Sequence, residues 1–149
     1  MLISKRNFFF AGVILFAIVI FFNIYKLPDL RKKTLLINNK KLEIEIADTT
    51  DMRYKGLSGR DYLCEECGML FIFADKYFPT FVMRDMKFAL DIIWISEGKI
   101  IKIDENLPME GKYPQAGYVS SEGVDMVLEV NAGYCKKNNI KIGEYLTFY

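Results

Sequence analysis

Short runs of alternating apolar and polar residues constrain the fold of this chain more than any other feature. Leu42, Ile44 and Ile46 alternate with Glu43 and Glu45. In a strand this pattern places apolar side chains on one face and charged side chains on the other. Similar short runs predict strands at residues 34–37, 42–47, 69–73, 80–83, 91–96, 99–104, 118–120, 126–130 and 145–149. Because no long helical pattern alternates with these runs, a doubly wound α/β fold is disfavoured.

Two short helices are expected among the strands. The cluster Thr49-Thr50-Asp51 offers caps for a helix over residues 51–55, and Gly56 can end it. Asn131 can cap a second short helix over residues 132–138. Both segments are too short to form a helical layer of their own. The helices are therefore expected to be accessories of a β domain.

The remaining connections have the composition of turns and loops. Asn38-Asn39-Lys40 and Glu97-Gly98 are typical of tight hairpins. Residues 105–117 contain two prolines and two glycines and predict a loop. We therefore expect one mostly β domain over residues 34–149, a compact β-sandwich or barrel-like fold with two short helices.

An uncharged apolar run precedes this domain. Residues 8–22 read FFFAGVILFAIVIFF, with Lys5 and Arg6 before the run and Lys26 after it. With its uncharged flanks, the run approaches the roughly 20 residues that a membrane helix needs. It lacks the small-residue cleavage pattern of a secretory signal peptide. We interpret residues 1–25 as an uncleaved signal anchor, a transmembrane helix that contacts the membrane through residues 8–22, followed by a linker at residues 26–33.

The flanking charges bear on the orientation of this anchor. Lys5 and Arg6 favour a cytoplasmic N-terminus, whereas Arg31, Lys32 and Lys33 favour the opposite orientation. A very short tail before a signal-like segment usually stays inside. We therefore expect a single-pass membrane protein with its domain on the extracytoplasmic side.

Charge and composition exclude several classes of function. From residue 34 onward the chain has 14 Lys and Arg and 18 Asp and Glu, a net charge of −4. Nucleic-acid binding normally requires a basic surface, so no nucleic-acid partner is expected. The chain contains no histidine, which excludes a histidine-based triad and every histidine-ligated metal site. No cofactor and no metal are expected.

Eight short motifs together resemble the signature of a known family. They occur in order between residues 42 and 149, and they are Ile46-Ala47-Asp48, Arg53, Gly56-Leu57, Gly68-Met69-Leu70-Phe71, Met83-Arg84-Asp85, Leu90-Asp91-Ile92-Ile93, Leu128-Glu129-Val130-Asn131-Ala132-Gly133 and Ile142-Gly143. This set is similar to that of the domain of unknown function family 192. The resemblance implies a small, mostly β, sandwich-like domain, often behind a signal sequence or anchor. The family has no established enzymatic activity, so the resemblance implies a fold but no particular reaction.

The chain departs from the family pattern at two motifs, one of them near the C-terminus, where the usual Gly-Asp pair is Gly143-Glu144. Where the family usually has Trp-Met-Lys-Asn, this sequence has Val82-Met83-Arg84-Asp85. The aromatic residue is lost and the amide becomes a carboxylate. Phe81, directly before this motif, could replace the missing ring.

Charged residues within the apolar motifs are the first candidates for a functional site. The candidate ligand-binding residues are Arg53, Met83, Arg84, Asp85, Asp91 and Glu129. In one interpretation they surround a cleft, where arginines hold an anionic group and two carboxylates share acid–base work. In the other they form a buried ion-pair network that fixes loops over the domain. We favour the network for the charged groups as a set.

Cys64 and Cys67 form a second candidate site. Two cysteines at this spacing suggest a redox pair or half of a metal site. A structural zinc site normally needs four ligands, and only Cys135 remains. For a domain outside the cell, a local disulfide between Cys64 and Cys67 is the favoured interpretation.

Aromatic residues form a weaker third group. Most are expected to pack in the core or at its rim. Tyr77-Phe78-Pro79 and Tyr113-Pro114 lie in expected loops and are the better binding candidates.

The motifs together favour a non-catalytic, membrane-anchored envelope domain. It would bind a small ligand, a glycan or a protein partner through a face that includes Arg53, Met83, Arg84, Asp91 and Glu129. A carboxylate-based hydrolase that uses Asp91 and Glu129 is the first alternative. A thiol redox or metal module at Cys64 and Cys67 is the second.

Overall fold

The computed structural model describes residues 32–148. The expected membrane anchor at residues 1–25 lies outside the described residues. Lys32 and Lys33, assigned above to a linker, belong to the first strand. No helix between residues 32 and 148 is both long and apolar enough to cross a membrane.

The described domain is mostly β, with two short helices, as predicted. Its strands are β1 (Lys32–Ile37), β2 (Lys40–Ala47), β3 (Cys67–Tyr77), β4 (Leu90–Ser96), β5 (Lys99–Leu107), β6 (Val124–Asn131) and β7 (Leu146–Phe148). Its helices are α2 (Thr50–Lys55) and α3 (Tyr134–Lys137).

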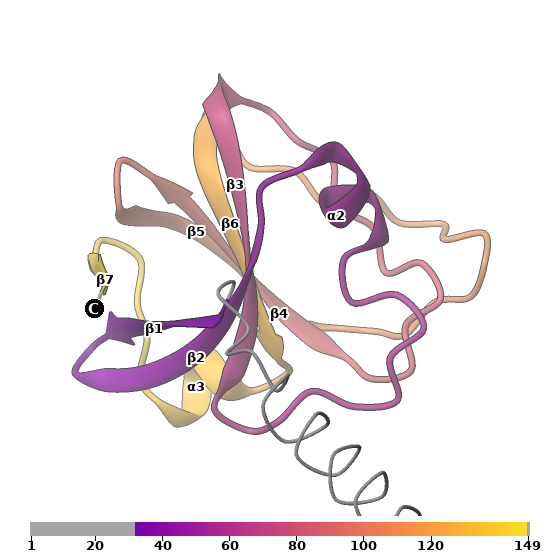
Figure 1. Cartoon of the computed structure of the whole chain (residues 1–149), viewed down its shortest axis with the longest axis horizontal. Coiled ribbons are helices and arrows are strands. Elements are labelled where there is room, and N and C mark those ends of the chain that lie inside the picture. Colours follow the sequence, from indigo (N-terminus) through magenta and orange to yellow (C-terminus); the bar gives the residue numbers. More distant parts are fainter. Residues whose placement is uncertain (1–31, 149) are drawn as a thin grey trace, which may run out of the picture. The chain divides into compact units, whose positions relative to one another are not determined.

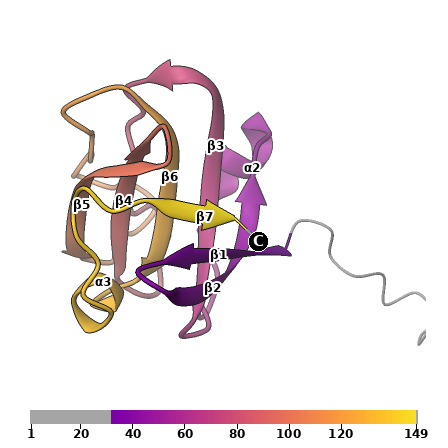
Figure 2. The same ribbon diagram turned by 90° about the vertical axis from the view of Figure 1, so that its left-hand side faces the viewer.

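All seven strands belong to one curled sheet, a half-barrel in the order β5-β4-β6-β3-β2-β1-β7. β2 and β3 are parallel, and every other neighbouring pair is antiparallel. Figure 2 shows β7 and β1 in front, with β5, β4, β6 and β3 curving around behind them. A single bridge between Lys99 and Tyr145 joins the region of β5 to that of β7. The sheet therefore curls until its two edges nearly meet.

Both faces of the sheet are buried, and this gives the domain two cores. The barrel core lies on the concave face, which α3 also covers, and contains Leu35, Ile37, Leu42, Ile44, Leu70, Ile93, Ile95, Ile100, Leu128, Val130, Tyr134, Cys135, Ile140 and Leu146. The outer core lies on the opposite face and contains Ala47, Leu57, Met69, Phe71, Phe73, Met83, Met86, Leu90, Ile92, Trp94, Leu107, Val124 and Val127. Figure 1 shows α2 and the long loops on the side of the sheet away from β1, β7 and α3. Burial on both faces explains why β4 is almost continuously apolar.

The two predicted hairpin turns are confirmed. Asn38 and Asn39 join β1 to β2 with φ angles of 48° and 62°. Glu97 and Gly98 join β4 to β5 with φ angles of 52° and 76°. Two successive positive φ values match the right-handed twist of the flanking strands. These turns therefore set the register of both hairpins.

Two predicted strands are wrong. Residues 80–83 and 118–120 lie in long loops and meet only at an isolated bridge between Phe81 and Tyr118. The two residues exchange backbone hydrogen bonds of 2.9 and 2.8 Å. The pairing does not extend beyond this bridge. The paired loops instead cover the outer core.

The prediction for the first helix is confirmed, and that for the cap of the second is wrong. The Thr49 side chain accepts a hydrogen bond of 3.3 Å from the backbone of Met52, and Gly56 ends α2. At α3 the capping position is Gly133, which has a left-handed φ of 80°. The side chain of Asn131 instead donates to the carbonyl oxygens of Leu63 and Cys64, at 3.1 and 2.9 Å. Asn131 therefore fixes a distant loop.

Candidate functional site

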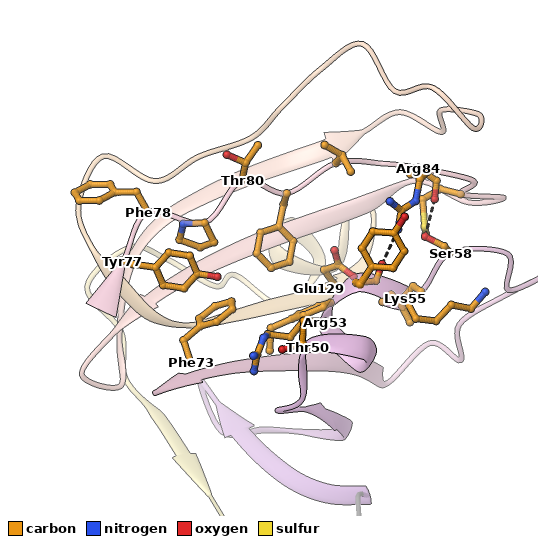
Figure 3. A pocket seen from close by; sticks show the side chains of 18 residues that line it. Thr50, Arg53, Lys55, Ser58, Phe73, Tyr77, Phe78, Thr80, Arg84 and Glu129 are labelled. Atoms are coloured by element: carbon orange, nitrogen blue, oxygen red, sulfur yellow. Dashed lines mark hydrogen bonds between the residues drawn. The ribbon is translucent and has the colours of Figure 1, made fainter. Parts of the chain in front are cut away.

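A pocket of about 410 Å³ opens over the outer face of the sheet. Its walls come from α2 and the turn after it, from aromatic side chains of β3 and from residues 77–82, and Glu129 reaches it from β6. Figure 3 shows Phe73, Tyr77 and Phe78 on one side of Glu129, and Ser58 and Arg84 on the other. The volume lies in the range typical of small-molecule sites.

Glu129 is the buried titratable group of this pocket. It lies between Met69 of β3 and Ile92 of β4 in the sheet, and it is only 5% exposed. No hydrogen bond or ion pair joins its carboxyl group to another described residue, and its oxygens keep contact with the space of the pocket. Burial raises the pKa of Glu129 to about 8, although the positive charge of Arg60 partly opposes this shift. The group is therefore mostly protonated at neutral pH and can donate a hydrogen bond.

Arg53 projects from α2 into the lining of the pocket. Its Nη1 atom donates to the carbonyl oxygens of Asp48 and Ile72, at 2.6 and 2.9 Å. Its guanidinium carbon lies 5.5 Å from the centroid of the Phe73 ring. These contacts hold the side chain in place and use one of its three nitrogen atoms.

Arg84 lines the pocket from the segment that follows Val82. Its Nη2 atom donates to the carbonyl oxygen of Tyr54 at 2.6 Å. The guanidinium group also lies over the Tyr54 ring, 4.1 Å from its centroid, which is a favourable cation–π contact. The carbonyl oxygen of Arg84 accepts a hydrogen bond of 2.8 Å from Ser58. Both the backbone and the side chain of Arg84 are thus fixed.

Asp91 lies elsewhere and has a structural role. It is fully buried and accepts three backbone hydrogen bonds, from Asn106 at 2.8 Å, Gly133 at 3.1 Å and Cys135 at 3.0 Å. The carboxylate thus ties the start of α3 and the end of β5 to β4. Three such bonds occupy a carboxylate that has no outlet to the pocket.

The two other candidates from the same motifs also lie outside the pocket lining. Met83 is fully buried in the outer core. Asp85 is exposed at a tight turn with a φ of 52°. Its carbonyl oxygen accepts a hydrogen bond of 2.9 Å from Gly59. Of the six candidates, only Arg53, Arg84 and Glu129 line the pocket.

Arg60 is a contributor that the sequence analysis missed. It forms a two-pronged ion pair with Glu45, with N–O distances of 2.7 and 2.8 Å. This hydrogen-bonded pair raises the pKa of Arg60, and Glu129 adds to the effect. Arg60 therefore supplies positive charge near Glu129. Its position after Gly59 in a loop gave no signal of this role.

Of the two aromatic segments predicted as binding candidates, only one lines the pocket, and its first residue, Tyr77, ends β3 rather than lying in a loop. Tyr77, Phe78 and Pro79 line the pocket, whereas Tyr113 lies outside the lining and is 77% exposed. Phe81, the proposed replacement for the lost family aromatic residue, also lines the pocket. Its ring meets that of Trp94 edge-on at 5.5 Å.

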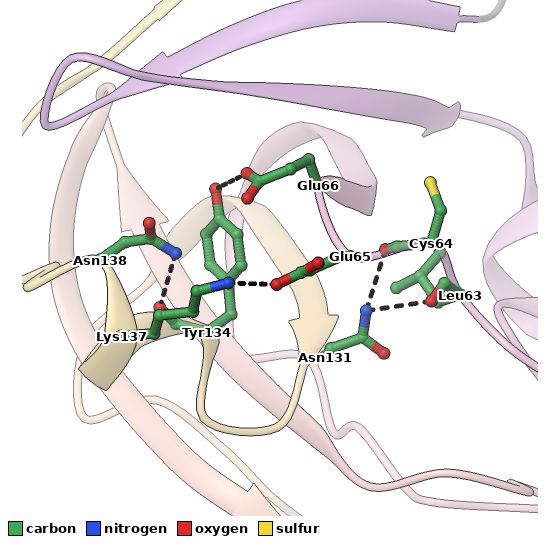
Figure 4. A network of polar contacts seen from close by, with 8 residues as sticks. All are labelled: Leu63, Cys64, Glu65, Glu66, Asn131, Tyr134, Lys137 and Asn138. Carbon is green, nitrogen blue, oxygen red and sulfur yellow. Dashed lines mark hydrogen bonds and ion pairs between the residues drawn. The ribbon is translucent and has the colours of Figure 1, made fainter.

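Cys64 and Cys67 lie in a separate loop before β3. The structure joins them by a disulfide, with Cα atoms 5.1 Å apart. Figure 4 shows how this loop is held against α3 and the end of β6. Glu65 pairs with Lys137, and Tyr134 donates to Glu66 at 3.4 Å. These contacts fix the loop to the body of the domain.

The described residues offer little for a metal or thiol chemistry. Residues 32–148 contain no group of three or more His, Cys, Asp or Glu side chains placed to hold a metal ion. Cys135 is a buried free thiol. Burial, and secondarily the negative charge of Asp91, raise its pKa far above the usual value. Cys135 is therefore a poor nucleophile.

The pocket can thus present a neutral acid, two fixed guanidinium groups and an apolar wall to the same molecule. A protonated carboxyl group can donate a hydrogen bond or a proton. Guanidinium groups bind carboxylates, phosphates and sulfonates. These groups could take up a ligand directly, whereas the set offers no ligand sphere for a metal.

Comparisons with known proteins agree with the mostly β fold. The chain is similar to a crystal structure from Sinorhizobium meliloti 1021, which is described as that of a proposed transcription regulator. The two sequences are 28% identical, the TM-score is 0.73, and the match covers 78% of this chain and 93% of that one. It is also similar to a protein of unknown function from Novosphingobium aromaticivorans DSM 12444, with 25% identity, a TM-score of 0.73 and coverage of 83% and 89%. No curated protein sequence matches the chain significantly.

The family model confirms the resemblance that the motifs predicted. The model of DUF192, described as "Uncharacterized ACR", matches residues 33–148. This range includes every strand that lines the pocket and both short helices. The chain belongs to the DUF192 family.

Proposed function

We propose that this DUF192 domain is a small-molecule-binding module held at the membrane surface. The observation that carries the proposal is the position of Glu129, a buried carboxyl group without a partner among the described residues, in a pocket of about 410 Å³. A buried polar group without a hydrogen bond lowers the stability of the folded state. Such a group in a native protein therefore calls for a functional explanation. A ligand that hydrogen-bonds to Glu129 would satisfy it.

The fixed positions of Arg53 and Arg84 support the same function. Both side chains are anchored by backbone carbonyl oxygens before any ligand arrives. A preorganised site loses less conformational entropy on binding. The arginines therefore favour a binding site over a patch of mobile surface charge.

Membrane attachment is part of the proposal. The apolar run at residues 8–22 would anchor the chain, with the domain on the extracytoplasmic side. One structural neighbour is described as a proposed transcription regulator. The net charge of −4 from residue 34 onward argues against DNA binding by this chain.

A catalytic role for Glu129 alone is the second candidate. A carboxyl group with a pKa of about 8 in a pocket is suited to general acid catalysis near neutral pH. Asp91 cannot be the second carboxylate at this site, because its oxygens are bound to backbone N–H groups on the opposite face. Hydrolysis through the Asp91–Glu129 pair is therefore not proposed.

The binding function can be tested on the full chain in lipid nanodiscs. A library of small molecules is screened for an increase in melting temperature, with empty nanodiscs as the blank. Hits are repeated on Arg84→Gln and on Lys99→Gln, which removes an exposed positive charge far from the pocket lining. If the ligand binds in the pocket, the increase in melting temperature should be smaller in Arg84→Gln and unchanged in Lys99→Gln. Equal shifts in both variants would place binding elsewhere.

The attachment has its own test. Membranes of expressing cells are washed with alkaline carbonate, and intact cells or spheroplasts are treated with protease. We expect the chain to stay in the pellet and the domain to be cut from outside. Release by carbonate would contradict the anchor, and full protection from protease would contradict the orientation.

A further inference from the structure

The charge of the pocket lining is strongly one-sided. Arg53, Lys55 and Arg84 are its cationic residues, and Glu129 is its one carboxyl group among the described residues. Neither Arg53 nor Arg84 forms an ion pair with a carboxylate between residues 32 and 148. Within the described part of the chain, their hydrogen bonds go to uncharged carbonyl oxygens. Between residues 32 and 148 the guanidinium groups therefore have no counter-ion.

Donor atoms remain on both arginines. Toward the described residues, Arg53 donates only through Nη1 and Arg84 only through Nη2. A guanidinium group has five N–H donors in a planar fork. Each side chain thus keeps donors for an acceptor outside the described residues, while its position is already fixed. Planar forks of this kind match the oxygens of carboxylate, phosphate and sulfonate groups.

Glu129 does not cancel this positive charge. Glu129 is only 5% exposed, and its carboxyl group lines the pocket between β3 and β4 without a hydrogen bond to another described residue. Burial without a partner disfavours the ionised form. The group therefore acts in the pocket as a neutral donor and acceptor of hydrogen bonds.

Much of the remaining lining is apolar, although Thr50, Ser58 and Thr80 add hydroxyl groups. Phe71 and Phe73 of β3, with Phe81 and Met86 from the covering loops, supply rings and a thioether to the wall. Phe71 and Phe81 pack edge-to-face at 4.8 Å. Such a wall suits a flat aromatic or short aliphatic body. Figure 3 shows Phe73, Tyr77 and Phe78 on the side of Glu129 away from Arg84.

We propose that the pocket binds small amphipathic anions. The anionic group meets the guanidinium group of Arg84, and the apolar body lies along the aromatic wall beyond Glu129, where the Arg53 guanidinium group packs against Phe73. This inference rests on the proposed binding function and names the ligand class of the same pocket. A cationic amine is disfavoured, because it would meet three positive side chains and a neutral acid.

Three probes with one aromatic body test this ligand class. They are 2-naphthalenesulfonate, 2-naphthylmethanol and 2-naphthylmethylammonium, which carry an anionic, a neutral and a cationic group. Binding is measured by isothermal titration calorimetry at pH 7 with the full chain in nanodiscs of uncharged lipid. The heat from empty nanodiscs is subtracted.

We expect the sulfonate to bind about tenfold or more tightly than the alcohol, since hydrogen bonds to charged groups are the strong ones. The ammonium probe should bind weakest. Arg84→Gln should lose most of the preference for the sulfonate over the alcohol. Lys99→Gln also removes one positive charge, but this variant should keep the preference for the sulfonate.

The outcomes separate the two proposals. Equal binding of sulfonate and alcohol, or tightest binding of the ammonium probe, overturns the anion preference but leaves a small-molecule site. Loss of the preference in Lys99→Gln as well as Arg84→Gln also overturns it, because the effect is then one of net charge. Failure of all three probes to bind counts against the binding function itself.

Discussion

Asp91 and Glu129 lie one register position apart on neighbouring strands, yet their carboxyl groups are on opposite faces of the sheet. Asp91 is opposite Val130, and Ile92 is opposite Glu129. Asp91 therefore faces α3, where it accepts hydrogen bonds from Gly133 and Cys135. Glu129 faces the pocket. The two residues that sequence reasoning paired for catalysis are separated by the sheet itself.

Replacement of Asp91 by asparagine should lower the stability of the domain. The amide keeps one acceptor oxygen and brings an NH₂ group toward backbone donors, so part of the three-bond arrangement is lost. We expect the free energy of unfolding to fall by roughly 2–4 kcal/mol. Urea denaturation of the full chain in nanodiscs measures it. Asp85→Asn is the matched control, because Asp85 is exposed and asparagine tolerates its positive φ. Equal losses would contradict this role of Asp91.

Glu129 should make the stability depend on pH. Its pKa is about 8 in the folded state, above the ordinary value of 4.5 that we take for the unfolded chain. Between these values the folded state binds more protons, so its stability falls as the pH rises, with a slope of up to about 1.4 kcal/mol per pH unit. Below pH 4.5 the contribution is constant. Glu129→Gln should flatten the slope between pH 5 and 8. An unchanged slope would show that Glu129 is not the group responsible.

Arg60 should tune this titration. Its positive charge lowers the pKa of Glu129, so Arg60→Gln should raise that pKa further and extend the loss of stability to higher pH. The overall destabilisation should be small, roughly 0.5–1 kcal/mol, because Arg60 and Glu45 are each about one-third exposed, at 35% and 33%. Carbon-13 NMR titration of labelled glutamate carboxyls measures the pKa. A downward shift, or an equal upward shift in Lys99→Gln, would contradict the coupling.

Gly68 should not tolerate a larger side chain. A Cβ atom there would lie 2.9 Å from the carbonyl oxygen of Glu129 and 3.0 Å from the Leu128 side chain. Since the strands must shift, Gly68→Ala should destabilise the domain by roughly 1–3 kcal/mol. Gly111→Ala is the control, because nothing lies within 4 Å of the Cβ position at Gly111. Thermal unfolding that is equal in the two variants would show that β3 and β6 adapt without cost.

The loop at Cys64 and Cys67 should be dispensable for pocket binding. Neither cysteine lines the pocket over Glu129. In the double variant Cys64→Ser/Cys67→Ser, 2-naphthalenesulfonate should bind with the affinity of the unmodified protein. The purified protein should contain no stoichiometric zinc by elemental analysis. A full loss of probe binding, or one zinc ion per chain, would instead favour a thiol or metal module.

Local patterns were enough to predict most of the strands. Alternation in residues 42–47 and the hairpin residues Asn38-Asn39 and Glu97-Gly98 act over a few positions, so the sequence contains the whole signal. The first helix was predictable for the same reason, since Thr49 and Gly56 cap it locally. Strands expected at residues 80–83 and 118–120 failed because strand formation there depends on a partner far along the chain.

The sequence by itself determined that the domain is mostly β, that it belongs with DUF192, and that charges within its motifs needed an explanation. Only the tertiary structure decided which of those charged side chains lie in the same site. The register between β4 and β6 sends Asp91 to α3 and Glu129 to the pocket, and the segment after Val82 brings Arg84 beside Tyr54. Strand register and loop packing are long-range properties, because they join residues tens of positions apart. A motif read along the chain cannot reveal them.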